Sequence, residues 1–260
     1  MEVIILDNQE QVSQFAANYV ASRILKKPRI VLGLPTGSSP LGMYKKLIDK
    51  YQQGILDFSE VITFNLDEYV GIVPGHSQSY NSYMYKNFFN FVNIKPHNIN
   101  IPDGLVADFD NYCKKYEQYI EDCGGIDLQI LGIGRTGHIG FNEPSSSLGS
   151  RTRIKTLTES TRQDNARFFN SIDEVPHHVI TMGIGSILDS KECMLIAFGE
   201  HKAESIAAMV EGCISSMLPA SALQFHPSIK VVIDSAAASK LKNKEYYKFV
   251  YDNKPAWQYV

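Results

Sequence analysis

The stretch LGIGRTGHIGFNEP, residues 131–144, follows an apolar run that is typical of a buried β-strand. Its glycines at 132, 134 and 137 match the dinucleotide-binding pattern G-x-G-x-x-G. That pattern holds a pyrophosphate only where the glycines turn a strand directly into a helix. Here the following residues contain further glycines, a proline and a run of serines, with no helical periodicity. We therefore predict a sharp turn that brings the backbone close to a ligand, and not a nicotinamide site.

Outward from this turn, short apolar runs alternate with helical patterns along the chain. The predicted strands are Val3–Leu6, Ile30–Leu34, Val61–Leu66, Leu128–Gly132, Val179–Gly183, Met194–Phe198 and Val231–Ile233, and the predicted helices include Gln9–Leu25, Pro40–Tyr51, Asp108–Asp122 and Lys202–Glu211. Nearly continuous apolar strands are typical of a sheet covered on both faces. We predict an α/β fold with one Rossmann-like domain over residues 1–260: three layers, with a doubly wound, mainly parallel sheet between helices.

The composition argues against nucleic acid and membrane partners. The 260 residues are 44% hydrophobic and 20% charged, with a net charge of −3, so no basic surface is expected. The first residues lack a signal-peptide pattern, and no apolar run approaches membrane length. The four cysteines match neither a metal site nor a disulfide framework. We expect free thiols and a cytoplasmic protein.

Polar side chains follow several predicted strands at the points where these strands end. The loop Thr36–Ser39 follows Leu34, the pair Asp67–Glu68 follows Leu66, and His138 and Glu143 follow the strand that ends near Leu131. Ligands of doubly wound folds bind outside the carboxyl ends of the strands. The sequence therefore predicts a functional site at this edge of the sheet.

The segment GLPTGSSP, residues 33–40, has the features of an anion-binding turn. Candidate phosphate ligands are the hydroxyls of Thr36, Ser38 and Ser39 and the backbone at Gly37. Ser39 followed by Pro40 is typical of an N-cap and a first helical residue, and the positive end of a helix favours a phosphate. Lys202 and Arg167 are candidate cations beside it. A capped helix that binds nothing is the alternative interpretation.

Four separated motifs, in order along the chain, resemble the glucosamine-6-phosphate deaminase family. They are GLPTGSSP at 33–40, TFNLDEYVG at 63–71, GHIGFNEPSSSLGSRTRIKTLT at 137–158 and the segment around Lys202. The resemblance implies a single α/β domain that converts glucosamine 6-phosphate and water to fructose 6-phosphate and ammonium. It implies no metal and no organic cofactor.

This chemistry needs a proton carrier for ring opening and a base for the aldose–ketose step. Histidine suits the first role, because its ordinary pKa of about 6.5 lies near working pH. The resemblance gives ring opening to His138, with Glu143 as its partner; Thr136 stands where the family often has an acidic residue or Asn. For the second role, Asp67 and Glu68 are both candidates from the residues alone, but neighbouring strand side chains point to opposite sides. The family pattern selects Asp67.

The resemblance also implies two further sites. Thr36–Ser39, Arg167 and Lys202 would bind the 6-phosphate, and residues 156–169 would form part of a mobile lid. The residues that match an allosteric site for N-acetylglucosamine 6-phosphate are Ser146, Ser147, Arg153, Lys155 and Thr156. Because that family site lies between subunits, we expect a homo-oligomer, with a hexamer among the states that fit. The alternatives are a 6-phosphogluconolactonase-type hydrolase of related fold and a non-catalytic sugar-phosphate sensor.

Overall fold

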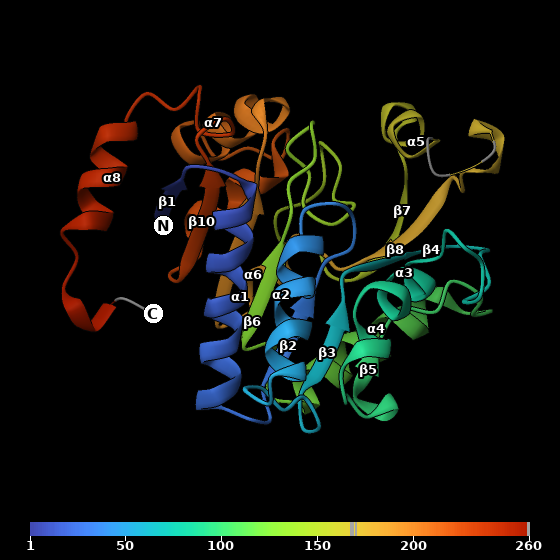
Figure 1. Ribbon diagram of the computed structural model, residues 1–260. Helices are drawn as coiled ribbons and strands as arrows, with labels where there is room; N and C mark the ends of the chain where they lie inside the picture. Colours follow the sequence, from blue (N-terminus) through green and yellow to red (C-terminus); the bar gives the residue numbers. More distant parts are fainter. Residues whose placement is uncertain (167–168, 170, 259–260) are drawn as a thin grey trace.

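A seven-stranded parallel sheet forms the centre of the molecule, as the computed structural model shows for the described residues 1–166, 169 and 171–258 (Figure 1). The strands lie in the order β1-β10-β9-β6-β2-β3-β5. Their bounds are β1 Glu2–Leu6, β2 Val31–Leu34, β3 Ile62–Asn65, β5 Ile99–Asn100, β6 Leu128–Leu131, β9 Glu192–Ala197 and β10 Ile229–Asp234. Every neighbouring pair is parallel, which confirms the predicted fold class.

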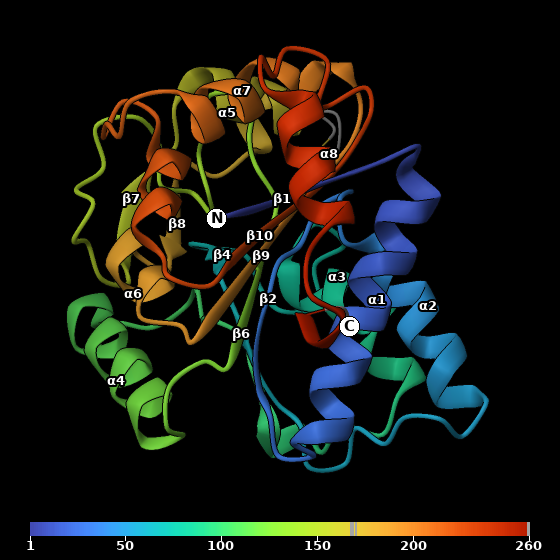
Figure 2. The ribbon, with the colours of Figure 1, turned by 90° about the vertical axis from the view of Figure 1, so that its left-hand side faces the viewer.

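Helices cover both faces of this sheet (Figure 2). They are α1 Gln9–Lys26, α2 Leu41–Gln52, α3 Tyr80–Asn87, α4 Phe109–Asp122, α5 Glu159–Ala166, α6 Ile184–Leu188, α7 Ala203–Glu211 and α8 Lys244–Asp252. Short 3₁₀ segments lie at Phe89–Phe91, Pro96–Asn98, Ile172–Glu174, Glu200–Lys202, Pro219–Phe225 and Ala256–Gln258. Helices α1 and α2 pack on one face, and α4, α6 and α7 pack on the other.

Alternation along each strand explains how the two cores form. In β1, Ile4 packs with α1 and α2, whereas Val3 belongs to the opposite core; in β2, Leu32 and Val31 divide in the same way. Successive strand side chains point to opposite faces, so a strand between two helical layers needs apolar residues at every position. No described helix combines the length and the apolarity that crossing a bilayer requires.

A second, three-stranded sheet is a correction to the sequence-based prediction. It pairs β4 (Asp67–Tyr69), β8 (His178–Thr181) and β7 (Arg153–Thr156) in the order β4-β8-β7, and both pairings are antiparallel. The run Val179–Gly183, expected in the doubly wound sheet, is part of β8 in this small sheet. Its apolar residues are buried here as they would be in the large sheet, so composition could not distinguish the two positions.

The predicted cap of α2 is wrong by one residue. The N-cap is Pro40, without a side-chain hydrogen bond, and the helix begins at Leu41. Ser39 does not cap it, because its side chain is directed toward the turn after β6: a Cβ built on Gly132 would lie 3.6 Å from Ser39 Oγ. The helix predicted to begin at Lys202 begins at Ala203, after the 3₁₀ turn Glu200–Lys202.

The end of the chain packs against its beginning. Helix α8 contacts edge strand β1 and lies outside it (Figure 1). The Glu2 carboxylate on β1 binds Lys230 of β10 and, at 2.7 Å, Lys254 after α8. The opposite edge strand, β5, has only two residues, Ile99–Asn100.

Candidate active site

Loops that follow three strands meet at the carboxyl edge of the large sheet. Ser39, after β2, lies beside Gly132, after β6, as the 3.6 Å approach described above shows. Lys202, after β9, donates a hydrogen bond of 2.7 Å from Nζ to the carbonyl oxygen of Ile133. The predicted phosphate-binding turn and its predicted lysine therefore border the same loop. Arg167, the other predicted phosphate ligand, lies outside the described residues.

The loop Thr36–Ser39 has the open backbone that an anion site requires. Gly37 has a φ of +86°, and a Cβ built on it would meet nothing within 4 Å. Its carbonyl oxygen accepts a hydrogen bond from the Tyr83 hydroxyl of α3. Glycine adopts this left-handed conformation without steric cost, which explains its place in the turn.

The Asp67 carboxyl is buried close to the loop that carries His138. Asp67 is only 6% exposed, and a Cβ on Gly140 would lie 3.6 Å from its Oδ2. Asp67 pairs across the small sheet with Thr181, whose hydroxyl accepts the Phe141 backbone N–H at 3.0 Å. Burial, and then the negative charge of Glu68, raise the pKa of Asp67 to about 8. A stronger base than an ordinary aspartate thus lies beside the histidine loop.

The neighbouring Glu68 carboxylate has a structural role. It accepts backbone N–H groups from Tyr69, Tyr80 and Asn81, each at 2.9 Å, and so stabilises the start of α3. These bonds point it away from the Asp67 side, as alternation along a strand requires. The two carboxylates, which were equal candidates for the base from the residues alone, therefore have different surroundings: Asp67 lies beside the histidine loop and Glu68 lies at the start of α3.

His138, Thr136 and Glu143 form one hydrogen-bonded group. Thr136 Oγ1 lies 2.9 Å from His138 Nδ1 and donates to Glu143 Oε2 at 3.3 Å; Nδ1 lies 3.4 Å from that same oxygen. A hydroxyl has one proton, so Thr136, if it donates to the carboxylate, must accept from Nδ1–H. This arrangement leaves Nε2 as the basic nitrogen. Burial raises the pKa of Glu143, but His138, Thr161 and Thr136 outweigh it and keep the pKa below its ordinary value.

Two further residues, absent from the predicted catalytic set, hold this loop in place. Asn142 is fully buried; its Nδ2 donates to the carbonyls of Ile139 and Met182, at 2.9 and 2.8 Å. Thr161 of α5 donates to Glu143 Oε1. Asn142 could be found in the FNEP motif, but the polar helix around Thr161 gave no sequence signal.

The predicted allosteric residues are only partly brought together. Arg153 and Lys155 share the half-buried face of β7, and Thr156 lies on its exposed face. Arg153 Nη1 donates to Asn142 Oδ1 at 3.0 Å, which connects this strand to the His138 loop. Ser146 is 3% exposed and its Oγ has no hydrogen-bond partner among the described residues, whereas Ser147 is exposed.

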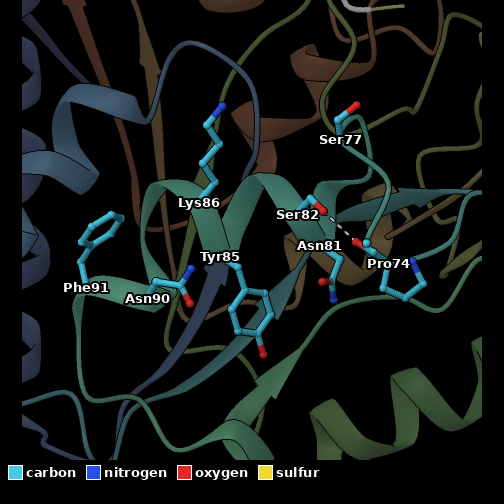
Figure 3. Close-up of a pocket in the computed structure, with 9 residues that line it drawn as sticks. Pro74, Ser77, Asn81, Ser82, Tyr85, Lys86, Asn90 and Phe91 are labelled. Atoms are coloured by element: carbon cyan, nitrogen blue, oxygen red, sulfur yellow. Dashed lines mark hydrogen bonds between the residues drawn. The ribbon is translucent and has the colours of Figure 1, made fainter.

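A separate hollow of about 590 Å³ lies over α3 (Figure 3). It is lined by Pro74, Gly75, Ser77, Asn81, Ser82, Tyr85, Lys86, Asn90 and Phe91. Ser82 Oγ closes one side with a 2.8 Å hydrogen bond to the Pro74 carbonyl. None of the predicted site residues lines this hollow, so we place the candidate site at the sheet edge.

The fold and the sequence of the chain are those of a family of sugar-phosphate enzymes. The family model described as glucosamine-6-phosphate isomerases/6-phosphogluconolactonase matches residues 7–232, and the chain belongs to this family. Within it, the curated glucosamine-6-phosphate deaminase of Arthrobacter sp. (strain FB24) is 52% identical over 258 residues, 99% of each chain. The deaminase of Hahella chejuensis (strain KCTC 2396) is 54% identical over 250 residues, covering 96% of this chain and 95% of the relative.

Solved structures divide between the two activities of the family. A structure described as a monomeric glucosamine-6-phosphate deaminase superposes with a TM-score of 0.90 at 47% identity, covering 92% of this chain and 99% of its own. The 6-phosphogluconolactonase of Trypanosoma cruzi gives a TM-score of 0.75 at 15% identity, covering 93% and 97%. The second likeness is one of fold alone.

Proposed function

We propose that this protein is an enzyme that converts glucosamine 6-phosphate and water to fructose 6-phosphate and ammonium. The observation that carries the proposal is the approach of a buried carboxyl, Asp67, to the loop that holds the His138–Glu143 pair. An aldose–ketose step needs a carboxylate of raised basicity, whereas lactone hydrolysis needs no base at C2. Relatives that are 52% and 54% identical over 99% and 96% of this chain are named glucosamine-6-phosphate deaminases.

The substrate's phosphate binds in the turn Thr36–Ser39 with Lys202 beside it, and Arg167 is the second proposed cation. Lys202 bonds the Ile133 carbonyl, and Ser39 lies beside the preceding Gly132, so a phosphate at this edge meets both hydroxyls and a positive charge. The phosphate anchors the sugar and sets which carbons face the acid–base groups.

Ring opening uses His138. Its Nε2 takes the proton of the anomeric hydroxyl and returns a proton to the ring oxygen, while the C1–O bond of the ring breaks and the C1 aldehyde forms. Thr136 and Glu143 hold the Nδ1–H side of the imidazole. The Thr136 hydroxyl replaces the acidic residue or Asn that the family often has, and the full negative charge of Glu143 supports the imidazolium.

Asp67 then takes the proton from C2 while the C1 oxygen takes a proton from the substrate ammonium, which gives an enol-type intermediate. Asp67 returns its proton to C1, and C2 is left as an iminium to which water adds. The amine that leaves from C2 starts as a substrate ammonium, and this positive charge favours the ionised form of the nearby carboxylate. Water replaces the nitrogen at C2, ammonium departs and the ketose remains. Burial that raises the pKa of Asp67 to about 8 makes it a proton acceptor suited to neutral pH.

The test measures ammonium and fructose 6-phosphate released from glucosamine 6-phosphate, together with hydrolysis of 6-phosphogluconolactone. We expect the first activity and not the second. The variant Asp67→Asn should abolish turnover while substrate still binds; persistent hydrogen exchange at C2 in this variant would exclude Asp67 as the base. Binding of the sugar phosphate by the unaltered protein without turnover would favour the sensor alternative instead.

We further propose a cytoplasmic homo-oligomer, up to a hexamer, that N-acetylglucosamine 6-phosphate activates. Support comes from Arg153 and Lys155 on one face of β7, and from the bond between Arg153 and Asn142, one residue before Glu143. All four cysteines are unpaired, as suits a reducing compartment. Light scattering and initial rates, each with and without the acetylated sugar phosphate, test this; a monomer with unchanged rates would reject it.

A further inference from the structure

The Glu143 carboxylate has partners from two distant parts of the chain. Its Oε2 faces Thr136 and His138, both in its own loop. Its Oε1 accepts a hydrogen bond from Thr161, which lies on α5. Glu143 is 2% exposed and Thr161 is 5% exposed, so water has little access to this contact. The orientation of the carboxylate therefore depends on a helix outside the catalytic loop.

The proton of the Thr161 hydroxyl is directed to Glu143 by Thr158. Thr158 Oγ1 donates to Thr161 Oγ1 at 3.1 Å and accepts the Thr161 backbone N–H at 3.2 Å. The second bond is the usual one between a capping threonine and the third residue of a helix. Since Thr161 accepts from Thr158, its single proton is available to the carboxylate.

Helix α5 also contacts the Asp67 side of the site. One turn after Thr161, Asn165 Nδ2 donates to the Tyr69 hydroxyl at 3.0 Å, and Tyr69 is two residues after Asp67 on β4. Residues four apart share a face of a helix, so a single face of α5 makes both contacts. Figure 1 shows α5 at the end of β7, above the small sheet.

We propose that Thr161 is a positioning residue for ring opening and that α5 aligns the acid–base pair through it. The inference rests on the proposed function, in which Glu143 orients His138. Without the bond from Thr161, the carboxylate keeps partners on Oε2 only and can turn about its last side-chain bond. When Glu143 no longer orients the His138 base, the site stabilises the transition state less well, but the phosphate contacts stay intact. The variant should therefore lower kcat and leave KM nearly unchanged.

The test compares Thr161→Val, which removes the hydroxyl at nearly constant shape, with Thr161→Ser, which keeps it. We expect kcat to fall about tenfold in T161V with KM within about twofold, and T161S to recover most of the loss. A second readout is the pH titration of the Glu143 carboxyl by carbon-13 NMR. Its midpoint should rise in T161V, because a donor to the ionised form is lost. Thr161→Ala gives the same two readouts if T161V does not fold.

The matched control is Asn165→Leu, which loosens the same face of α5 at Tyr69 and leaves Glu143 untouched. Its Glu143 titration should equal that of the unaltered protein. Equal shifts in T161V and N165L, an unchanged kcat in T161V, or no recovery in T161S would each overturn the proposal. Absence of ammonium release from the unaltered protein would overturn the proposed function, while the Glu143 titration would still test the Thr161 contact.

Discussion

Replacement of Asp67 by Asn should stabilise the fold, and the stabilisation should increase with pH. Burial and the Glu68 charge raise the pKa of Asp67 from its ordinary 3.8 to about 8. Between these two values the unfolded chain has lost the proton while the folded protein still holds it. The unfolded state then binds fewer protons than the folded state, so the free energy of unfolding falls as pH rises. Asn cannot ionise and is free of this cost.

The gain in stability of D67N depends on how far the pH lies above the pKa of Asp67 in the unfolded chain. One unit corresponds to about 1.36 kcal/mol, so the cost of Asp67 is roughly 2 kcal/mol at pH 5 and roughly 4 kcal/mol at pH 7. Above about pH 8 the folded carboxyl also ionises, and the difference between the two proteins should level off.

Urea unfolding of both proteins at pH 5, 6, 7 and 8 measures this difference. Any pH-independent effect of the amide is constant and does not change the slope. Asp49→Asn, at an exposed carboxylate on α2, is the matched control for the loss of one carboxylate. A D67N advantage that is the same at pH 5 and pH 7 would mean that the Asp67 carboxyl titrates normally, and the burial argument would fail.

Three further predictions concern activity. His138→Gln should lower kcat/KM less severely than Asp67→Asn, because part of the sugar opens spontaneously; equal losses would remove His138 from ring opening. Lys202→Ala should raise KM about tenfold or more with little change in kcat, and an unchanged KM would exclude Lys202 from phosphate binding. Gly134→Ala should lower kcat, since a Cβ there would lie 2.1 Å from His138 Nε2 and displace the ring. Full activity of G134A would show that the ring position is not critical.

The large sheet could be predicted because its strands are buried on both faces. Runs such as Val31–Leu34 and Leu128–Leu131 have no polar alternation, and only a central strand tolerates that. The small sheet could not be predicted in the same way. Strand β4 has three residues, two of them acidic. In β7, half-buried charged residues alternate with exposed residues. Neither strand has the sequence pattern of a buried strand.

The site was predictable where chemistry and backbone turn coincide in one motif. His138 and Glu143 lie five residues apart in a glycine-rich loop, and Asp67 follows a buried strand. Thr161 was not predictable, because a threonine on a short polar helix has the composition of a surface residue. Its contact with Glu143 arises from the docking of α5, which is tertiary information that local pattern does not contain.

Helix α8 has a consequence for how the protein tolerates truncation. Strand β1 presents one side of its backbone away from the sheet, and such a row of amide and carbonyl groups is a template on which a foreign strand can grow. The helix and the Lys254–Glu2 ion pair shield that row, while β5, at the far side, is too short to serve as a template. A protease cut before Lys244 would therefore leave the backbone edge of β1 exposed, and the truncated protein should aggregate more readily.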